Sequence, residues 1–119
     1  MTIPIELLVV HFVGDYLLQS DYMALNKSRS WAALTAHVCV YSLCFTPWGW
    51  RFALLTWVTH FATDAVTSRL NVWLRARRER YFYIGIGADQ LTHAVTLAWT
   101  HRLYGGPLAI FAHALAQTG

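Results

Sequence analysis

The chain has 119 residues, a length typical of one domain. Apolar residues make up 56% of it and charged residues only 13%, against about 25% charged residues in an average soluble domain. Because a small domain buries a limited share of its surface, this composition predicts apolar helix faces in contact with lipid. The net charge of +3 gives no reason to expect binding of a nucleic-acid polymer.

The hydrophobic pattern predicts an all-α fold, a polytopic membrane bundle of four spans plus a short C-terminal helix. The first predicted helix covers residues 3–19, with Pro4 placed where the first helical turn tolerates it. The second covers residues 31–45 and ends before Pro47, which cannot continue a helix. The others cover residues 51–74, 84–103 and 108–116, and all five form one predicted domain, residues 1–119.

Basic residues gather after the first and third predicted helices. Lys27 and Arg29 follow the first helix, and four arginines occur between positions 75 and 80. For a multi-pass membrane protein, the positive-inside rule then predicts that both loops lie in the cytoplasm and both termini outside. The apolar composition makes membrane lipid an expected partner. Because four short helices enclose little volume, further copies of the chain are expected partners as well.

Histidine and aspartate recur at helical spacing. Three pairs lie four residues apart: His11–Asp15, His60–Asp64 and Asp89–His93. Since residues i and i+4 share a helix face, each of three helices presents one imidazole and one carboxylate to the same side. His37 adds an imidazole from the second helix. Counted at about 1.5 Å per residue from the basic-loop ends, these groups lie at similar depths, which predicts one convergent site.

Neutral imidazole and carboxylate are ligands that suit zinc first, with manganese or iron also compatible. The sequence contains no paired-cysteine metal motif. The predicted metal ligands are His11, Asp15, His37, His60, Asp64, Asp89 and His93. Three further polar residues are candidates to support the ligands or to bind substrate. They are Gln19 and Ser68, four residues after Asp15 and Asp64, and Gln90, next to Asp89.

Three functions are compatible with this pattern. The first is a metal-dependent hydrolase that acts from the cytoplasmic side on a phosphoester, in a lipid or a nucleotide-like molecule, with Asp15 or Asp89 as general base. The second is a non-catalytic membrane protein that binds a host partner and uses the same residues as a structural metal site or a polar core. A single His–Asp pair is more often such a buried contact, whereas three pairs at matching depth favour a metal site. The third is a small metal or ion carrier, disfavoured because the outward half is poor in charge.

The run from His11 to Ala24, HFVGDYLLQSDYMA, resembles the opening of the domain-of-unknown-function family 3307. Later blocks fit as well: Ala36-His37, THFATD at Thr59–Asp64 and DQLTH at Asp89–His93. The resemblance covers about residues 8–94 and implies a small membrane protein of bacteria or their phages, without an established reaction. It therefore implies a multi-pass location in a prokaryotic inner membrane. A looser similarity in His–Asp spacing to inner-membrane metal-dependent hydrolases and to zinc-dependent phospholipase C and nuclease folds implies phosphoester hydrolysis.

Overall fold

The computed structural model describes residues 4–104, apart from the side chains of residues 24 and 25. Its elements are α1 (Ile5–Phe12), the π-helical η1 (Val13–Leu17), α2 (Asp21–Asn26), α3 (Trp31–Leu43), the 3-10 helix η2 (Thr46–Trp48), α4 (Trp50–Arg75) and α5 (Glu79–Tyr104). Within residues 4–104 there is no strand, so the all-α prediction is confirmed. The predicted helix 108–116 lies outside the described residues.

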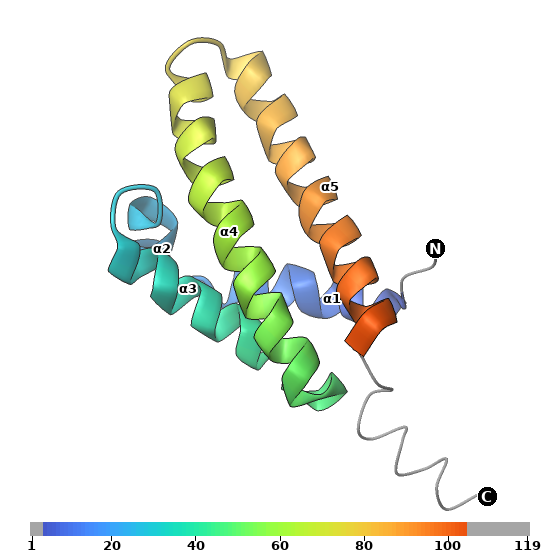
Figure 1. Cartoon of the computed structure of the whole chain (residues 1–119). Coiled ribbons are helices and arrows are strands. Elements are labelled where there is room, and N and C mark those ends of the chain that lie inside the picture. Colours follow the sequence, from blue (N-terminus) through green and yellow to red (C-terminus); the bar gives the residue numbers. More distant parts are fainter. Residues whose placement is uncertain (1–3, 105–119) are drawn as a thin grey trace, which may run out of the picture.

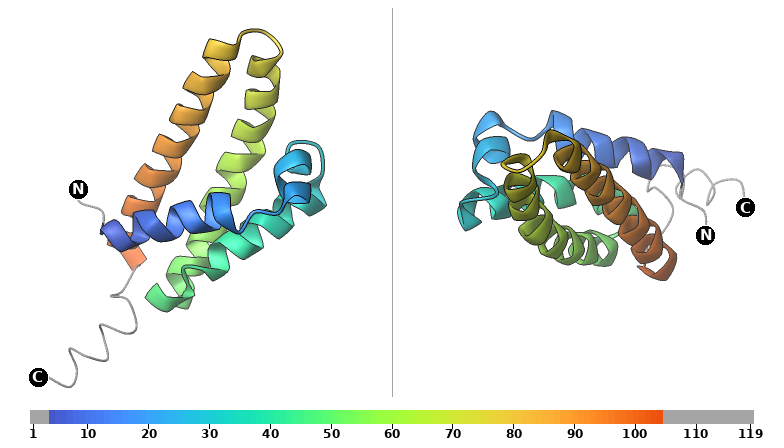
Figure 2. Two further views of the ribbon diagram at one scale, coloured as in Figure 1. Left: turned by 180° about the vertical axis from the view of Figure 1, so that it is seen from behind. Right: turned by 90° about the horizontal axis from the view of Figure 1, so that it is seen from above.

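The long helices α4 and α5 form an antiparallel hairpin (Figure 1). The shorter helices α1 and α3 lie against the half of this hairpin that is farther from its tip (Figures 1 and 2). The tip therefore extends beyond the N-terminal helices. This arrangement brings η1, α3, α4 and α5 together at the middle of the hairpin, where the predicted ligands lie.

Local signals explain where the N-terminal helices begin. The Ser20 hydroxyl accepts a hydrogen bond from the Met23 amide at 3.2 Å and caps α2, a helix that the polar composition of this stretch did not predict. Ser30 caps α3 in the same way, accepting from the Ala33 amide at 3.2 Å. Before α4, Gly49 has φ 121°, a value that favours glycine. Each loop thus ends on a residue suited to starting a helix.

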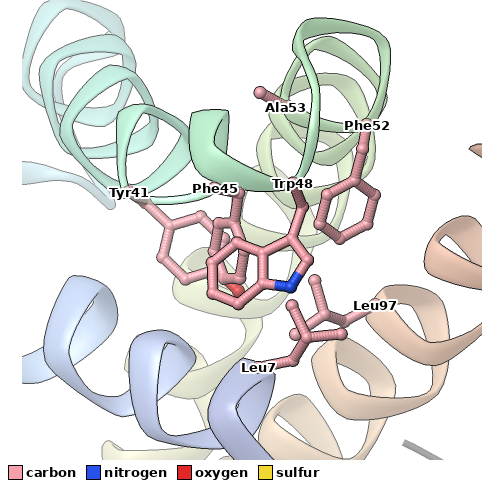
Figure 3. Close-up of a cluster of buried hydrophobic side chains, with 7 residues drawn as sticks. All are labelled: Leu7, Tyr41, Phe45, Trp48, Phe52, Ala53 and Leu97. Carbon is pink, nitrogen blue, oxygen red and sulfur yellow. The ribbon is translucent and has the colours of Figure 1, made fainter. Parts of the chain in front are cut away.

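A hydrophobic cluster joins the helices at the open end of the hairpin (Figure 3). It combines Leu7 of α1, Tyr41 of α3, Phe52 and Ala53 of α4 and Leu97 of α5, with Phe45 and Trp48 from the α3–α4 connection. Full burial of each large side chain contributes about 1.5–3 kcal/mol. Because Tyr41 also contacts the predicted ligands, the core and the site are one continuous unit.

The predicted membrane spans are not found. Helices α1 and α3 have 8 and 13 residues, and a span needs about 20. Helices α4 and α5 have 26 residues each, but charged residues interrupt their apolar stretches. No helix of the described chain combines the length and the apolar character needed to cross a membrane. This finding contradicts the predicted multi-pass location in an inner membrane. That prediction rested on the average apolar content and did not take into account the charged residues within each helix.

Large apolar side chains nevertheless remain exposed on several helices, among them Val9, Leu54, Leu91 and Trp99. Where such side chains form a contiguous patch, the patch often marks contact with a partner. The expected partners, lipid and further copies of the chain, stay predictions, and sedimentation analysis of the purified protein can test self-association.

Candidate metal centre

A π-helical turn positions the first carboxylate of the site. The Leu18 amide donates to the Val13 carbonyl at 2.9 Å, the i→i+5 bond of a π-helix, and this turn contains the buried Asp15. Single π turns inside helices occur frequently at functional sites. Gly14 lets the turn approach α3: a Cβ placed there would lie 3.0 Å from Cδ2 of Tyr41. Its missing side chain therefore helps to place Asp15.

Replacing Gly14 with leucine should destabilise the protein by about 1–3 kcal/mol, because the added side chain has no space against Tyr41. Chemical denaturation of the metal-free protein measures the loss. Gly87→Leu is the matched control, since Gly87 in α5 is exposed and a Cβ there meets nothing within 4 Å. There the gain in helix propensity should stabilise the protein by up to about 1 kcal/mol. Equal effects of the two changes would contradict the close approach of η1 to α3.

Four side chains from three elements form a first donor set: Asp15 of η1, His37 of α3, and His60 and Asp64 of α4. All are buried, and one ligand atom of each lies within 4.8 Å of the others. Nε2 of His37 lies 3.1 Å from Oδ1 of Asp15 and 3.2 Å from Oδ2 of Asp64. Nε2 of His60 lies 3.5 Å from that same Asp64 oxygen. Asp15 of η1, His37 of α3 and the His60–Asp64 pair of α4 therefore converge.

A second donor set consists of Asp64, Asp89 and His93, again with ligand atoms within 4.8 Å of one another. Nε2 of His93 lies 3.1 Å from Oδ1 of Asp64 and 3.2 Å from Oδ1 of Asp89. Asp64 thus belongs to both sets, and each of its oxygens faces a different one. The imidazoles of His60 and His93 stack at 4.2 Å between the sets. A carboxylate shared in this way can bridge two ions.

The donor atoms fit a metal better than they fit one another. The Nε2 atoms of His37 and His60 face each other at 3.1 Å, while His37 Nε2 also has an Asp15 and an Asp64 oxygen within 3.2 Å. One nitrogen can donate only one N–H, so these contacts cannot all be hydrogen bonds. Oδ1 of Asp15 and Oδ1 of Asp89 are buried and accept no well-aligned hydrogen bond from the described residues, although Nε2 of His37 and of His93 lie 3.1 and 3.2 Å away. Divalent cations satisfy such converging lone pairs.

Electrostatics separate the three imidazoles. Burial lowers the pKa of His60 to about 3 despite the nearby Asp64, so this ring is neutral and its lone pair is available. Burial disfavours charge on His93 as well, but contacts with Asp64 and Asp89 overcome it and raise its pKa to about 9. Contacts with Asp15 and Asp64 likewise raise the pKa of His37. Burial opposes ionisation of Asp15 and Asp64. The contact with His37, joined at Asp64 by the contact with His93, nevertheless holds the pKa of both carboxyls well below the usual range, so both are ionised.

A hydrogen-bonded chain supports the carboxylates from the side of α1. The Gln90 amide group donates to Oδ2 of Asp15 at 3.1 Å and to Oδ2 of Asp89 at 3.3 Å. Its oxygen then accepts from Nε2 of His11 at 2.9 Å, which leaves Nδ1 of His11 to accept from the Tyr41 hydroxyl at 2.7 Å. Both nitrogens of His11 are thus engaged, and His11 belongs to neither donor set. The structure therefore places this predicted ligand beside the donor sets, in contact with Gln90 and Tyr41.

The two other supporting residues lie at a cavity above the carboxylates. Gln19 lines the cavity, and its buried Oε1 has no hydrogen-bond partner among the described residues. Ser68 also lines it, although its hydroxyl donates to the Asp64 backbone carbonyl. The cavity has a volume of about 360 Å³ and reaches Asp15, Asp64 and Asp89. This volume lies at the small end of ligand sites, so a small molecule could reach the donor sets.

Sequence reasoning missed two residues of the site. Lys27, assigned to a basic loop, places Nζ 3.3 Å from Oδ2 of Asp64. Tyr41 stacks on His60 with ring centroids 3.8 Å apart. The signal for Tyr41 was present, because it follows His37 by four residues and so shares its helix face. No local pattern could place Lys27, since its partner lies 37 residues away.

A family model described as a protein of unknown function (DUF3307) matches residues 3–115. The chain belongs to this family. The match extends the resemblance seen in the HFVGDYLLQSDYMA run over nearly the whole DUF3307 chain, and it assigns no reaction. No solved structure matches the chain. The features that indicate a function are therefore the donor sets and the cavity themselves.

Proposed function

We propose that this DUF3307 protein is a metal-dependent hydrolase that binds two divalent ions and acts on a phosphoester. The observation that carries the proposal is the shared carboxylate of Asp64, whose two oxygens face two donor sets beneath one cavity. Paired ions about 4 Å apart are a recurrent arrangement for phosphoester hydrolysis. Mixed imidazole and carboxylate donors suit zinc first, with manganese or iron as alternatives.

The chain's own residues would prepare this chemistry. Bound divalent ions would acidify a water molecule and neutralise charge on the phosphoryl oxygens. Asp15 and Asp89 each keep one oxygen on Gln90, so their orientation is held while Oδ1 faces the donor sets. Both also line the cavity, where either could accept a proton from the attacking water. His11 and Tyr41 hold Gln90 in place from behind.

Elemental analysis and an assay of phosphoester turnover test the proposal on the same preparations. Wild type should hold two divalent ions per chain, one for each donor set. His60→Ala should lower affinity at the first set by at least about 100-fold, because a direct ligand matters no less than its supporting residues. Turnover should fall with it, while an ion at the second set is retained.

His101→Ala is the control for this experiment, since His101 lies in α5 outside both donor sets. It should keep metal content and turnover. Wild type that binds no zinc, manganese or iron after reconstitution would refute the proposal. It would favour the alternative of a non-catalytic binding protein with a polar core, which the ion pair of Lys27 with Asp64 would then stabilise.

A further inference from the structure

Lys27 places an ammonium group against the donor sets. Its Nζ lies 3.3 Å from Oδ2 of Asp64, the oxygen that also faces His37 and His60. The side chain follows α2 and lines the cavity, with 20% of its surface exposed. A lysine at this position can leave Asp64 when an ion takes the carboxylate, and it remains beside the cavity for another anion. Arg75 lines the same cavity, but about 16 Å further along α4 from Asp64.

With two divalent ions bound, the net charge of the site would favour binding of a dianion. Asp15, Asp64 and Asp89 carry three negative charges, and the imidazoles are neutral when they act as ligands. Two divalent ions together with Lys27 would bring five positive charges, which leaves two in excess. A phosphate monoester carries a charge of about −2 at neutral pH, because its second pKa is about 6. A diester carries only one negative charge and leaves the site unbalanced.

The cavity also limits the organic part of the substrate. At about 360 Å³ it suits a small molecule rather than a polymer. Beyond the carboxylates, toward the hairpin tip, its wall includes the apolar side chains of Val72, Phe82 and Ile86. Val72 lies about 12 Å along α4 from Asp64, and Phe82 lies about 10 Å along α5 from Asp89. A phosphate on the carboxylate side would therefore leave an organic group against apolar surface.

We infer that the substrate is a phosphate monoester of a small organic group, and that Lys27 binds its phosphate. This inference rests on the proposed function and names the substrate class of the same site. Hydrolysis forms one P–O bond from water and breaks the ester P–O bond. The protons of the water end on the released alcohol and on hydrogen phosphate, so no other reactant is needed.

Calorimetric titration of inorganic phosphate into the manganese-loaded protein tests the role of Lys27 without any turnover. Lys27→Met should weaken phosphate binding about 10- to 100-fold, the effect expected for a lost charge-assisted hydrogen bond. The same variant should bind manganese as tightly as wild type or more tightly, because no ammonium competes for Asp64. Lys27→Arg should restore most of the phosphate affinity.

Arg29→Met is the matched control, because it removes one positive charge from the same loop and Arg29 does not line the cavity. Phosphate affinity that falls equally in both variants, or in neither, would overturn the role of Lys27 while metal binding still supports the proposed function. Wild type should cleave 4-nitrophenyl phosphate faster than bis(4-nitrophenyl) phosphate, and the reverse order would overturn the substrate class alone. A wild type that binds none of zinc, manganese and iron would refute the proposed function as well.

Discussion

Replacing Asp64 with asparagine should abolish metal binding at both donor sets and cost the metal-free protein about 3–5 kcal/mol of stability. The carboxylate is buried, and it contacts Lys27, His37 and His93. Asparagine keeps the size but removes the charge, so these basic groups lose the anion that pairs with them. Denaturation in the presence of a chelator measures the stability, and calorimetric titration with zinc or manganese measures the binding.

Asp21→Asn is the control for this change. Asp21 is exposed in the first turn of α2, where the loss of its charge should cost less than about 1 kcal/mol and leave metal binding intact. An Asp64→Asn variant that still holds one ion tightly would show that the carboxylate is not shared between the two sets. Stability equal to that of Asp21→Asn would contradict the buried ion-pair network.

Metal affinity should rise steeply with pH between about 6.5 and 9 and then level off. His93 has a pKa raised to about 9 in the metal-free protein, so a proton must leave its ring before it can act as a ligand. Each displaced proton makes the affinity rise about tenfold per pH unit below that pKa. His37, whose pKa is also raised, adds a similar dependence at the first set, whereas His60 is already neutral throughout this range.

The stability of the metal-free protein should move in the opposite direction. Because the pKa of His93 is higher in the folded state than the unfolded value of 6.5, its contribution is complete below about pH 6.5 and is lost as pH rises through about 9. Competition with a fluorescent zinc indicator measures the affinity, and denaturation with a chelator measures the stability. His101→Asn should keep both profiles, while His93→Gln should flatten the profile of the second set. Affinity independent of pH in wild type would contradict protonated His93.

The helices themselves could be predicted from local sequence, with errors at the ends. Predicted helices 31–45 and 51–74 correspond to α3 (Trp31–Leu43) and α4 (Trp50–Arg75). Predicted helix 84–103 begins earlier, at Glu79, because the residues from Glu79 to Tyr83 already belong to α5. Environment was harder to predict than helicity. Mean apolar content does not report how charged residues are distributed along each helix, and this distribution decides whether a helix can span a membrane.

The local sequence by itself determined which chemical groups share a helix face. Four-residue spacing places His60 with Asp64 and Asp89 with His93 on single faces, because 3.6 residues complete a turn. Only the tertiary structure decided which of these groups meet. The π turn and Gly14 bring Asp15 to His37, while His11 bonds to Gln90 instead of facing the donor sets.

The crossing of α3, α4 and α5 also makes Asp64 common to both donor sets, and it brings Lys27 to that carboxylate from 37 residues away. Helical periodicity acts over one or two turns, so it cannot specify contacts of this range. They depend on how the helices pack, which the cluster around Tyr41, Phe52 and Leu97 holds in place.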